Sequence, residues 1–96
     1  MGNIEFAWDR IKARSNLAKH GVSFEEAQTV FFDDNARLID DPDHSAGEER
    51  FLLLGYSLQS RCLMVCHCYR EADSIIRLIS ARRATAHEEK EYWSFQ

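Results

Sequence analysis

The chain has little glycine and almost no proline: four glycines are scattered over its 96 residues, and there is one proline. So few glycines exclude the glycine-rich loops that cradle the phosphates of ATP or of a dinucleotide cofactor. Long apolar runs are missing too, because the longest, residues 51–54 and 63–66, fall far short of the roughly 20 residues that cross a bilayer. The N-terminus also lacks the basic and then apolar stretches of a signal peptide. We therefore expect a cytoplasmic protein that makes no membrane contact.

Cysteine is scarce as well. The three cysteines, Cys62, Cys66 and Cys68, are an odd number gathered in one short segment. This arrangement suits buried thiols in a reducing compartment better than a framework of disulfides. We predict that all three belong to the core.

The chain also lacks an excess of positive charge. The chain has 12 Lys and Arg against 16 Asp and Glu, a formal net charge of −4, which argues against a protein that coats nucleic acid by bulk electrostatics. The distribution is uneven, because residues 36–50 hold five acids against two Arg whereas residues 51–83 hold five Arg against two acids. The sequence therefore predicts a basic sheet that follows an acidic loop.

Hydrophobic residues make up 45% of the chain, which is enough for one core, so we expect a single domain over residues 1–96. Near its start, a short strand over 3–6 leads into a helix over 9–20. Asp9 is the expected N-terminal cap of this helix, and Gly21 stands where a left-handed C-terminal cap belongs.

A second helix begins at a capping box. The Ser23 hydroxyl can accept from the Glu26 amide while the Glu26 carboxylate reaches back to the Ser23 amide. Residues 33–35, Asp-Asp-Asn, end this helix.

The rest of the chain favours strands. The expected elements are a short strand over 36–40, an exposed loop over 41–47, strands over 50–56, 61–69 and 74–83, and a last helix from the Thr85/Glu88 capping box to about Trp93. The three long strands have short connections and so form an antiparallel meander. The predicted fold class is therefore α+β: a short N-terminal strand, two helices, a mostly antiparallel sheet and a C-terminal helix. Since both faces of this sheet are apolar, one takes the helices and the other needs the terminal helix or another protein to cover it.

The sheet also predicts a site. If 57–60 and 71–73 are tight loops, Arg50 lies opposite His67 and His67 opposite Arg77, all on one face. Guanidinium groups can grip a phosphate and stabilise developing charge, while imidazole can move a proton near neutral pH. A competing interpretation makes these residues strand-end charges in surface ion pairs, and a one-residue slip would move His67 to the other face.

Further candidates are weaker. Lys19 and His20 close the first helix and could join the site, although cations at a helix C-terminus are also favoured by the helix dipole. Neither His44 in its acidic turn nor the segment Cys66–His67–Cys68 offers ligands at a recognisable metal-binding spacing. We therefore predict neither a metal nor a cofactor.

The motifs together resemble the BrnT family of bacterial toxins over most of the chain, from about Ile4 to Trp93. The resemblance is carried by Phe6, Ala7, Trp8, Asp9, Lys12, Asn16, residues 19–27, residues 43–45, residues 48–50, Gly55, His67, residues 77–85 and Glu88. Two positions depart from the family pattern: Arg10 stands where proline is frequent, and Ala7 where an acid is common.

This resemblance implies a RelE-like fold and a ribonuclease that halts growth by cutting RNA without the ribosome. It also implies a BrnA-type antitoxin, a ribbon-helix-helix dimer flanked by two toxins, through which the complex reaches operator DNA. On this hypothesis His67 carries the proton, and Arg50 and Arg77 hold the scissile phosphate. The residues expected to add RNA contacts are Lys19, His20, Arg82 and Arg83. The product would be a 2′,3′-cyclic phosphate, and no metal would be needed.

A second function remains open. The chain could be a non-catalytic module whose sheet binds a DNA-binding partner and helps it to repress, which the acidic net charge favours.

Overall fold

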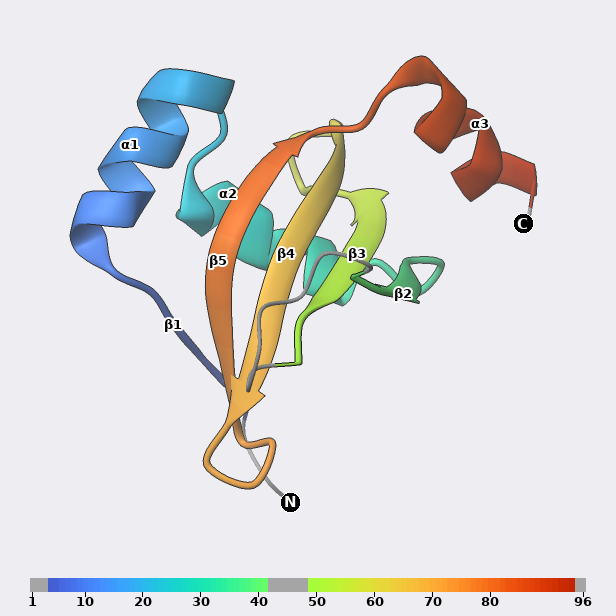
Figure 1. Cartoon of the computed structure of the whole chain (residues 1–96). Coiled ribbons are helices and arrows are strands. Elements are labelled where there is room, and N and C mark those ends of the chain that lie inside the picture. The colour runs from blue at the N-terminus through green and yellow to red at the C-terminus, as the bar shows by residue number, and fades with distance from the viewer. Residues whose placement is uncertain (1–3, 42–48, 95–96) are drawn as a thin grey trace.

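Figure 1 shows the computed structural model of the chain, which describes residues 4–41 and 49–94. Its elements are β1 (Glu5–Ala7), α1 (Arg10–His20), α2 (Phe24–Gln28), the 3-10 helix η1 (Thr29–Phe32), β2 (Arg37–Asp40), β3 (Phe51–Tyr56), β4 (Cys62–Arg70), β5 (Ile75–Arg83) and α3 (Ala86–Ser94). The five strands form one sheet in the order β1-β5-β4-β3-β2, and all neighbours are antiparallel except β1 and β5. The predicted α+β fold is confirmed.

Local signals set the ends of the first two helices as predicted. The Asp9 carboxylate accepts from the Ile11 amide at 2.8 Å, and Gly21 ends α1 in the left-handed region with φ 69°. The Ser23 hydroxyl accepts from the Glu26 amide at 3.0 Å and so caps α2. The second helix is shorter than predicted, because after Gln28 the chain tightens into η1.

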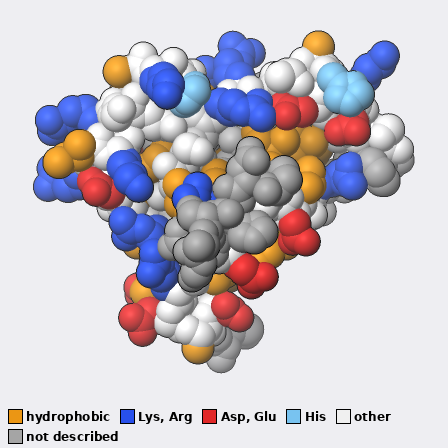
Figure 2. All heavy atoms as spheres, viewed as in Figure 1, with side chains coloured by type: hydrophobic (Ala, Val, Ile, Leu, Met, Phe, Trp, Pro, Cys, Tyr) orange, Lys and Arg blue, Asp and Glu red, His pale blue; other side chains and the backbone are white. Residues whose placement is uncertain are grey.

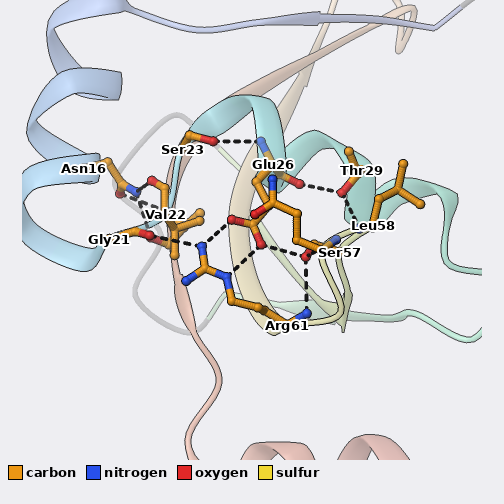
Figure 3. A network of polar contacts seen from close by, with 11 residues as sticks. Asn16, Gly21, Val22, Ser23, Glu26, Thr29, Ser57, Leu58 and Arg61 are labelled. Carbon is orange, nitrogen blue, oxygen red and sulfur yellow. Dashed lines mark hydrogen bonds and ion pairs between the residues drawn. The ribbon is translucent and has the colours of Figure 1, made fainter.

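One face of the sheet packs against α1 and α2. The main core joins these helices and their connection to the inward side chains of the long strands: Val22, Phe24, Ala27, Val30, Leu53, Leu63, Val65, Ile76, Leu78 and Ala81. A buried amide holds α1 to β5, because Asn16 Nδ2 donates to the carbonyls of Val22 at 2.9 Å and Ala81 at 2.8 Å. Figure 3 shows Asn16 at this position.

The other face, here called the open face, is partly covered by α3. Tyr92 of α3 is 3% exposed and packs with Leu54, Cys62 and Met64 in a second core cluster. Its hydroxyl donates to Asp33 Oδ2 at 2.7 Å and so ties α3 to the segment after η1. The terminal helix therefore covers the part of the open face formed by β3 and the start of β4.

The predicted strand register is wrong by one residue. Tyr56 pairs with Cys62 and Arg70 with Ile75, so each hairpin loop holds one more residue than the prediction assumed. As a result Phe51 pairs with His67, and after an irregularity at Cys66/His67, His67 pairs with Leu78 rather than Arg77. Since opposed residues share a face, the slip turns His67 to the helix side of the sheet.

Candidate functional site

His67 is a core residue in this structure. Its side chain has no exposed surface, and its ring packs edge-on against Phe31 with centroids 4.8 Å apart. The two ring nitrogens lie 3.3 Å from the carbonyl oxygen of Val65 and from the hydroxyl of Tyr69. Burial lowers the pKa of the imidazole, which favours its neutral form. An imidazole without exposed surface cannot touch a phosphodiester, so the catalytic role of His67 stays a prediction without its geometric basis.

The two arginines predicted beside His67 flank a cysteine instead. Arg77 pairs with Cys68, and one step beyond the Phe51–His67 pair the same register brings Arg50 level with Cys68. Arg50 and Arg77 therefore do share a face, as predicted, but it is the open face, away from His67.

The cysteines are buried and form no disulfide, as predicted. Burial raises the pKa of the Cys66 thiol to about 11, and Asp41, whose Oδ2 accepts from Sγ at 3.6 Å, adds to the rise, while Arg50 acts in the opposite sense. Burial also raises the pKa of Cys62 to about 11. Thiols that stay protonated are poor nucleophiles, so Cys62 and Cys66 have a packing role.

A second group of predicted residues meets where α1 and β5 end. The Asn16 amide fixes Ala81 beside α1, and His20 lies one helical turn, about 6 Å, beyond Asn16. Arg83 lies two strand residues, about 6.6 Å, beyond Ala81 in the same direction, since α1 and β5 run upward together in Figure 1. The structure thus brings exposed Lys19, half-buried His20 and exposed Arg83 to one corner.

A buried ion pair holds this corner in place. Glu26 is 4% exposed, and its carboxylate pairs with Arg61, whose Nε donates at 2.9 Å, and accepts from the Ser57 hydroxyl at 2.7 Å. The other end of the Arg61 guanidinium donates to the Gly21 carbonyl at 3.1 Å. Figure 3 shows this network, which joins the end of α1, the start of α2 and the β3–β4 hairpin.

The network corrects one prediction. The Glu26 carboxylate turns inward to Arg61 instead of reaching back to the Ser23 amide, and sequence reasoning missed this pair. The hydrogen bonds from Arg61, reinforced by Ser57 and the charge of Arg83, outweigh burial and lower the pKa of Glu26. The sequence held one signal for this ion pair. Glu26 is a second acid directly after Glu25, and a single acid is enough at the start of so short a helix.

Arg82 is engaged by α3. Its two terminal nitrogens donate to the two carboxylate oxygens of Glu88 at 2.8 and 2.9 Å. Hydrogen bonding from Arg82, with help from Thr85, lowers the pKa of Glu88 to about 2. Glu88 also completes the predicted capping box, because it accepts from the Thr85 amide at 2.9 Å. An RNA phosphate would have to compete with this carboxylate for Arg82.

Cations nevertheless gather on one side of the molecule. The sequences of α1 and β5 contain Lys, Arg and one His but no acid, and Figure 2 shows most Lys and Arg on the side where Figure 1 places these elements. Several of these side chains make no hydrogen bond or ion pair with another described residue: Arg10, Lys12, Arg14, Lys19, Arg77 and Arg83. We call the surface formed by the Lys12 and Lys19 flank of α1 and by the end of β5 with Arg83 the seam.

The cations of β5 are too far apart to share the single phosphodiester that was predicted. Arg83 lies six residues beyond Arg77, about 20 Å along the strand, and on the other face of the sheet, because Arg83 pairs with Leu63 whereas Arg77 pairs with Cys68. These two cations cannot converge on one phosphate.

Metal ligands do not come together in the described ranges 4–41 and 49–94, where no group of three or more His, Cys, Asp or Glu could hold an ion. The His44 turn considered above lies outside these ranges. Among the described helices, none is long and apolar enough to span a membrane.

Comparison with known proteins identifies the fold and then the family. The crystal structure of the Brucella abortus ribonuclease toxin BrnT matches with a TM-score of 0.66 and 20% identity, over 86% of this chain and 99% of that chain. A search of curated proteins finds no match. The fold is thus one used by a bacterial ribonuclease toxin. Residues 8–88 match the family model of the ribonuclease toxin BrnT of type II toxin-antitoxin systems.

The chain therefore belongs to the BrnT family of ribonuclease toxins, as the sequence motifs indicated. A toxin of a type II system has an antitoxin as its partner.

Proposed function

We propose that this chain is a ribonuclease that cuts RNA without a metal ion, with the RNA lying along the seam. The observation that carries the proposal is the run of exposed cations on α1, continued by exposed Arg83 at the end of β5, without an acid in either element, in a chain whose net charge is −4. A row of guanidinium and ammonium groups follows a phosphate backbone and gives no base specificity.

The corner at the end of the seam offers the chemistry. Lys19 and Arg83 hold the scissile phosphate, and His20 accepts the proton of the 2′-hydroxyl. The 2′-oxygen bonds to phosphorus while the bond from phosphorus to the 5′-oxygen breaks, and the leaving 5′-oxygen takes a proton from water. The products are a 2′,3′-cyclic phosphate and a 5′-hydroxyl. Arg82, once Glu88 releases it, holds a neighbouring phosphate, and Arg77 and Arg50 on the open face hold phosphates farther along the strand.

The hypothesis drawn from the sequence, with His67 as the proton carrier, remains the competing assignment for the same reaction. It requires the packing around Phe31, Phe51 and Tyr69 to open, since these rings enclose the imidazole. His20 needs no such movement, and this difference is the reason to favour it.

Cleavage of RNA in EDTA by the purified toxin tests the proposal. His20→Ala should slow cutting by about 100-fold or more, the usual contribution of a general base. His87→Ala is the matched control, because His87 lies exposed on α3 and should be dispensable. Full activity of His20→Ala, or an inactive His67→Ala that is still folded, would return the role to His67. Loss of activity on adding EDTA would refute metal independence.

For the partner, we propose a BrnA-type ribbon-helix-helix antitoxin in the cytoplasm, with two toxins on one antitoxin dimer and contact with operator DNA made through the antitoxin. Expression of the toxin should arrest growth, coexpression of the adjacent gene should restore it, and native mass spectrometry should give the 2:2 mass.

The non-catalytic alternative, a binding module that helps a partner to repress DNA, draws support from the burial of His67 and the engagement of Arg82 by Glu88. It predicts an intact complex but no arrest and no cleavage.

A further inference from the structure

A groove between α1 and the start of α2 lies apart from the proposed cutting site. It has a volume of about 240 Å³. Its main lining side chains are Trp8, Arg10, Arg14, Leu17, Phe24 and Glu25. Pockets for drug-sized ligands are larger, from about 300 Å³ upward, so this one suits a single planar ring system.

The groove uses the flank of α1 that the seam does not use. Arg10, Arg14 and Leu17 follow each other at spacings of four and three residues, so they line one flank of the helix. Lys12 and Lys19 are seven residues apart and lie about half a turn away from Arg10. A ligand in the groove would therefore contact Arg10 and Arg14, whereas a phosphate at the corner would contact Lys19 and Arg83.

The chemistry of the lining points to an anion joined to an aromatic ring. The guanidinium groups of Arg10 and Arg14 are exposed and make no ion pair with another described residue. The half-buried Trp8 indole is braced edge-on by buried Phe24, with centroids 5.9 Å apart and planes at 76°. An aromatic surface beside guanidinium groups is the usual means of holding an unstacked base and its phosphate. Glu25 at the rim can accept a hydrogen bond from a base amino group.

We propose that this groove binds one nucleotide of an RNA strand, outside the nucleotides that are cut. The proposal rests on the proposed ribonuclease function. RNA is favoured over an acidic peptide because Arg10 and Arg14 continue the cations of α1 without an intervening acid, so one phosphate backbone can follow both flanks.

Tryptophan fluorescence can test the groove directly. The chain has two tryptophans, so Trp93→Phe leaves Trp8 as the single reporter. A decamer of 2′-O-methyl RNA should quench it, since this RNA cannot be cut for lack of a free 2′-hydroxyl. Arg10→Ala/Arg14→Ala should weaken the quench by about tenfold, the effect of losing one charge-assisted contact. Lys90→Ala is the matched control, because Lys90 lies exposed on α3, outside the groove and the seam, and its loss should leave the Trp8 signal of bound RNA in place.

Other ligands in the same fluorescence experiment distinguish the possible occupants of the groove. 5′-AMP and 5′-UMP in place of the decamer show whether a free nucleotide is enough, and inorganic phosphate shows whether the base matters. Quenching by phosphate as strong as by nucleotides, no quenching by the decamer, or an unchanged affinity in the double variant would overturn the proposal. Quenching by polyglutamate but not by RNA would overturn it in favour of a protein partner.

The effect on catalysis is measured separately. Arg10→Ala/Arg14→Ala should raise KM for long RNA by about tenfold and leave kcat unchanged, because the groove acts on binding. An inactive His20→Ala that still shows the Trp8 quench would support both proposals. A toxin that never cuts RNA yet binds the decamer in the groove would refute the ribonuclease function and leave the binding site standing.

Discussion

The side-chain amide of Asn16 is hydrogen-bonded to both backbone groups of Ala81: Nδ2 donates to the carbonyl oxygen at 2.8 Å, and Oδ1 accepts from the amide at 3.1 Å. Asn16 is 6% exposed, so the backbone of Ala81, rather than water, satisfies both polar atoms of its side-chain amide. It fixes α1 against β5 and thereby places the cations of α1 beside Arg83 at the end of β5, which together make the seam.

Asn16→Ala should lower the free energy of unfolding by about 3 kcal/mol, because it leaves buried backbone groups of β5 without partners. Urea unfolding measures the loss. Asn35→Ala is the matched control, since Asn35 is exposed, and it should stay within about 0.5 kcal/mol of the wild type. An Asn16→Ala protein as stable as the control would mean that water takes over the bonds.

The ion pair between Glu88 and Arg82 should make stability depend on pH. Because the folded pKa of Glu88 is lowered to about 2, the pair stabilises the protein fully above the unfolded value of about 4.5 and loses its effect as the pH falls towards 2. The stability difference between wild type and Glu88→Gln should therefore shrink as urea unfolding is repeated from pH 6 to pH 3. Glu91→Gln, at an exposed position, should show no such trend.

His67 should produce a second pH effect at higher pH. Its folded pKa is lowered by burial, so the unfolded state binds the proton more readily. Stability is thus highest above the unfolded pKa of about 6.5 and falls as the pH drops below it. His67→Gln should flatten the stability curve between pH 7 and pH 5, whereas His87→Gln should leave its shape unchanged. If the stability of His67→Gln still falls as steeply between pH 7 and pH 5, a group other than His67 causes the pH dependence.

The cysteines give a measure of how firmly α3 is seated. Since Cys62 is 6% exposed, packs with Tyr92 and has a raised pKa, its reaction with a thiol reagent at pH 8 should be slow in the native protein. Tyr92→Ala should speed modification of Cys62 by at least about tenfold, detected by mass spectrometry of the peptides, while Cys68 stays slow. Trp93→Ala is the control, because Trp93 is 57% exposed.

Much of the fold could be predicted from the sequence because its signals are local. Asp9, Gly21, Ser23 and Thr85 act through hydrogen bonds or dihedral angles within one helical turn, and each does in the structure what its type and position indicate. Strand-like runs between short connections likewise revealed the three long strands.

The register could not be predicted in this way. In the β4–β5 turn Glu71, Ala72 and Asp73 all have positive φ, between 53° and 71°, although none is a glycine. Nothing in such a segment indicates a left-handed path, so the sequence predicts a loop that is one residue too short. That error moved His67 from a surface row into the core.

The site residues drawn from the sequence therefore remain a prediction, whereas the geometry predicted for them is wrong. Arg77, Arg83, Lys19 and His20 do lie along one pair of elements, but their spacing depends on the Asn16 contact. A hydrogen bond that joins residues 65 positions apart leaves no trace in local sequence patterns.

The β4–β5 turn also has a practical use. It projects from the end of the sheet remote from the corner in Figure 1, and the length of β5 puts about 26 Å between them. Its exposed residues offer an attachment point for a dye or a tether, so that single toxin molecules could be immobilised or followed with the proposed catalytic corner left unobstructed.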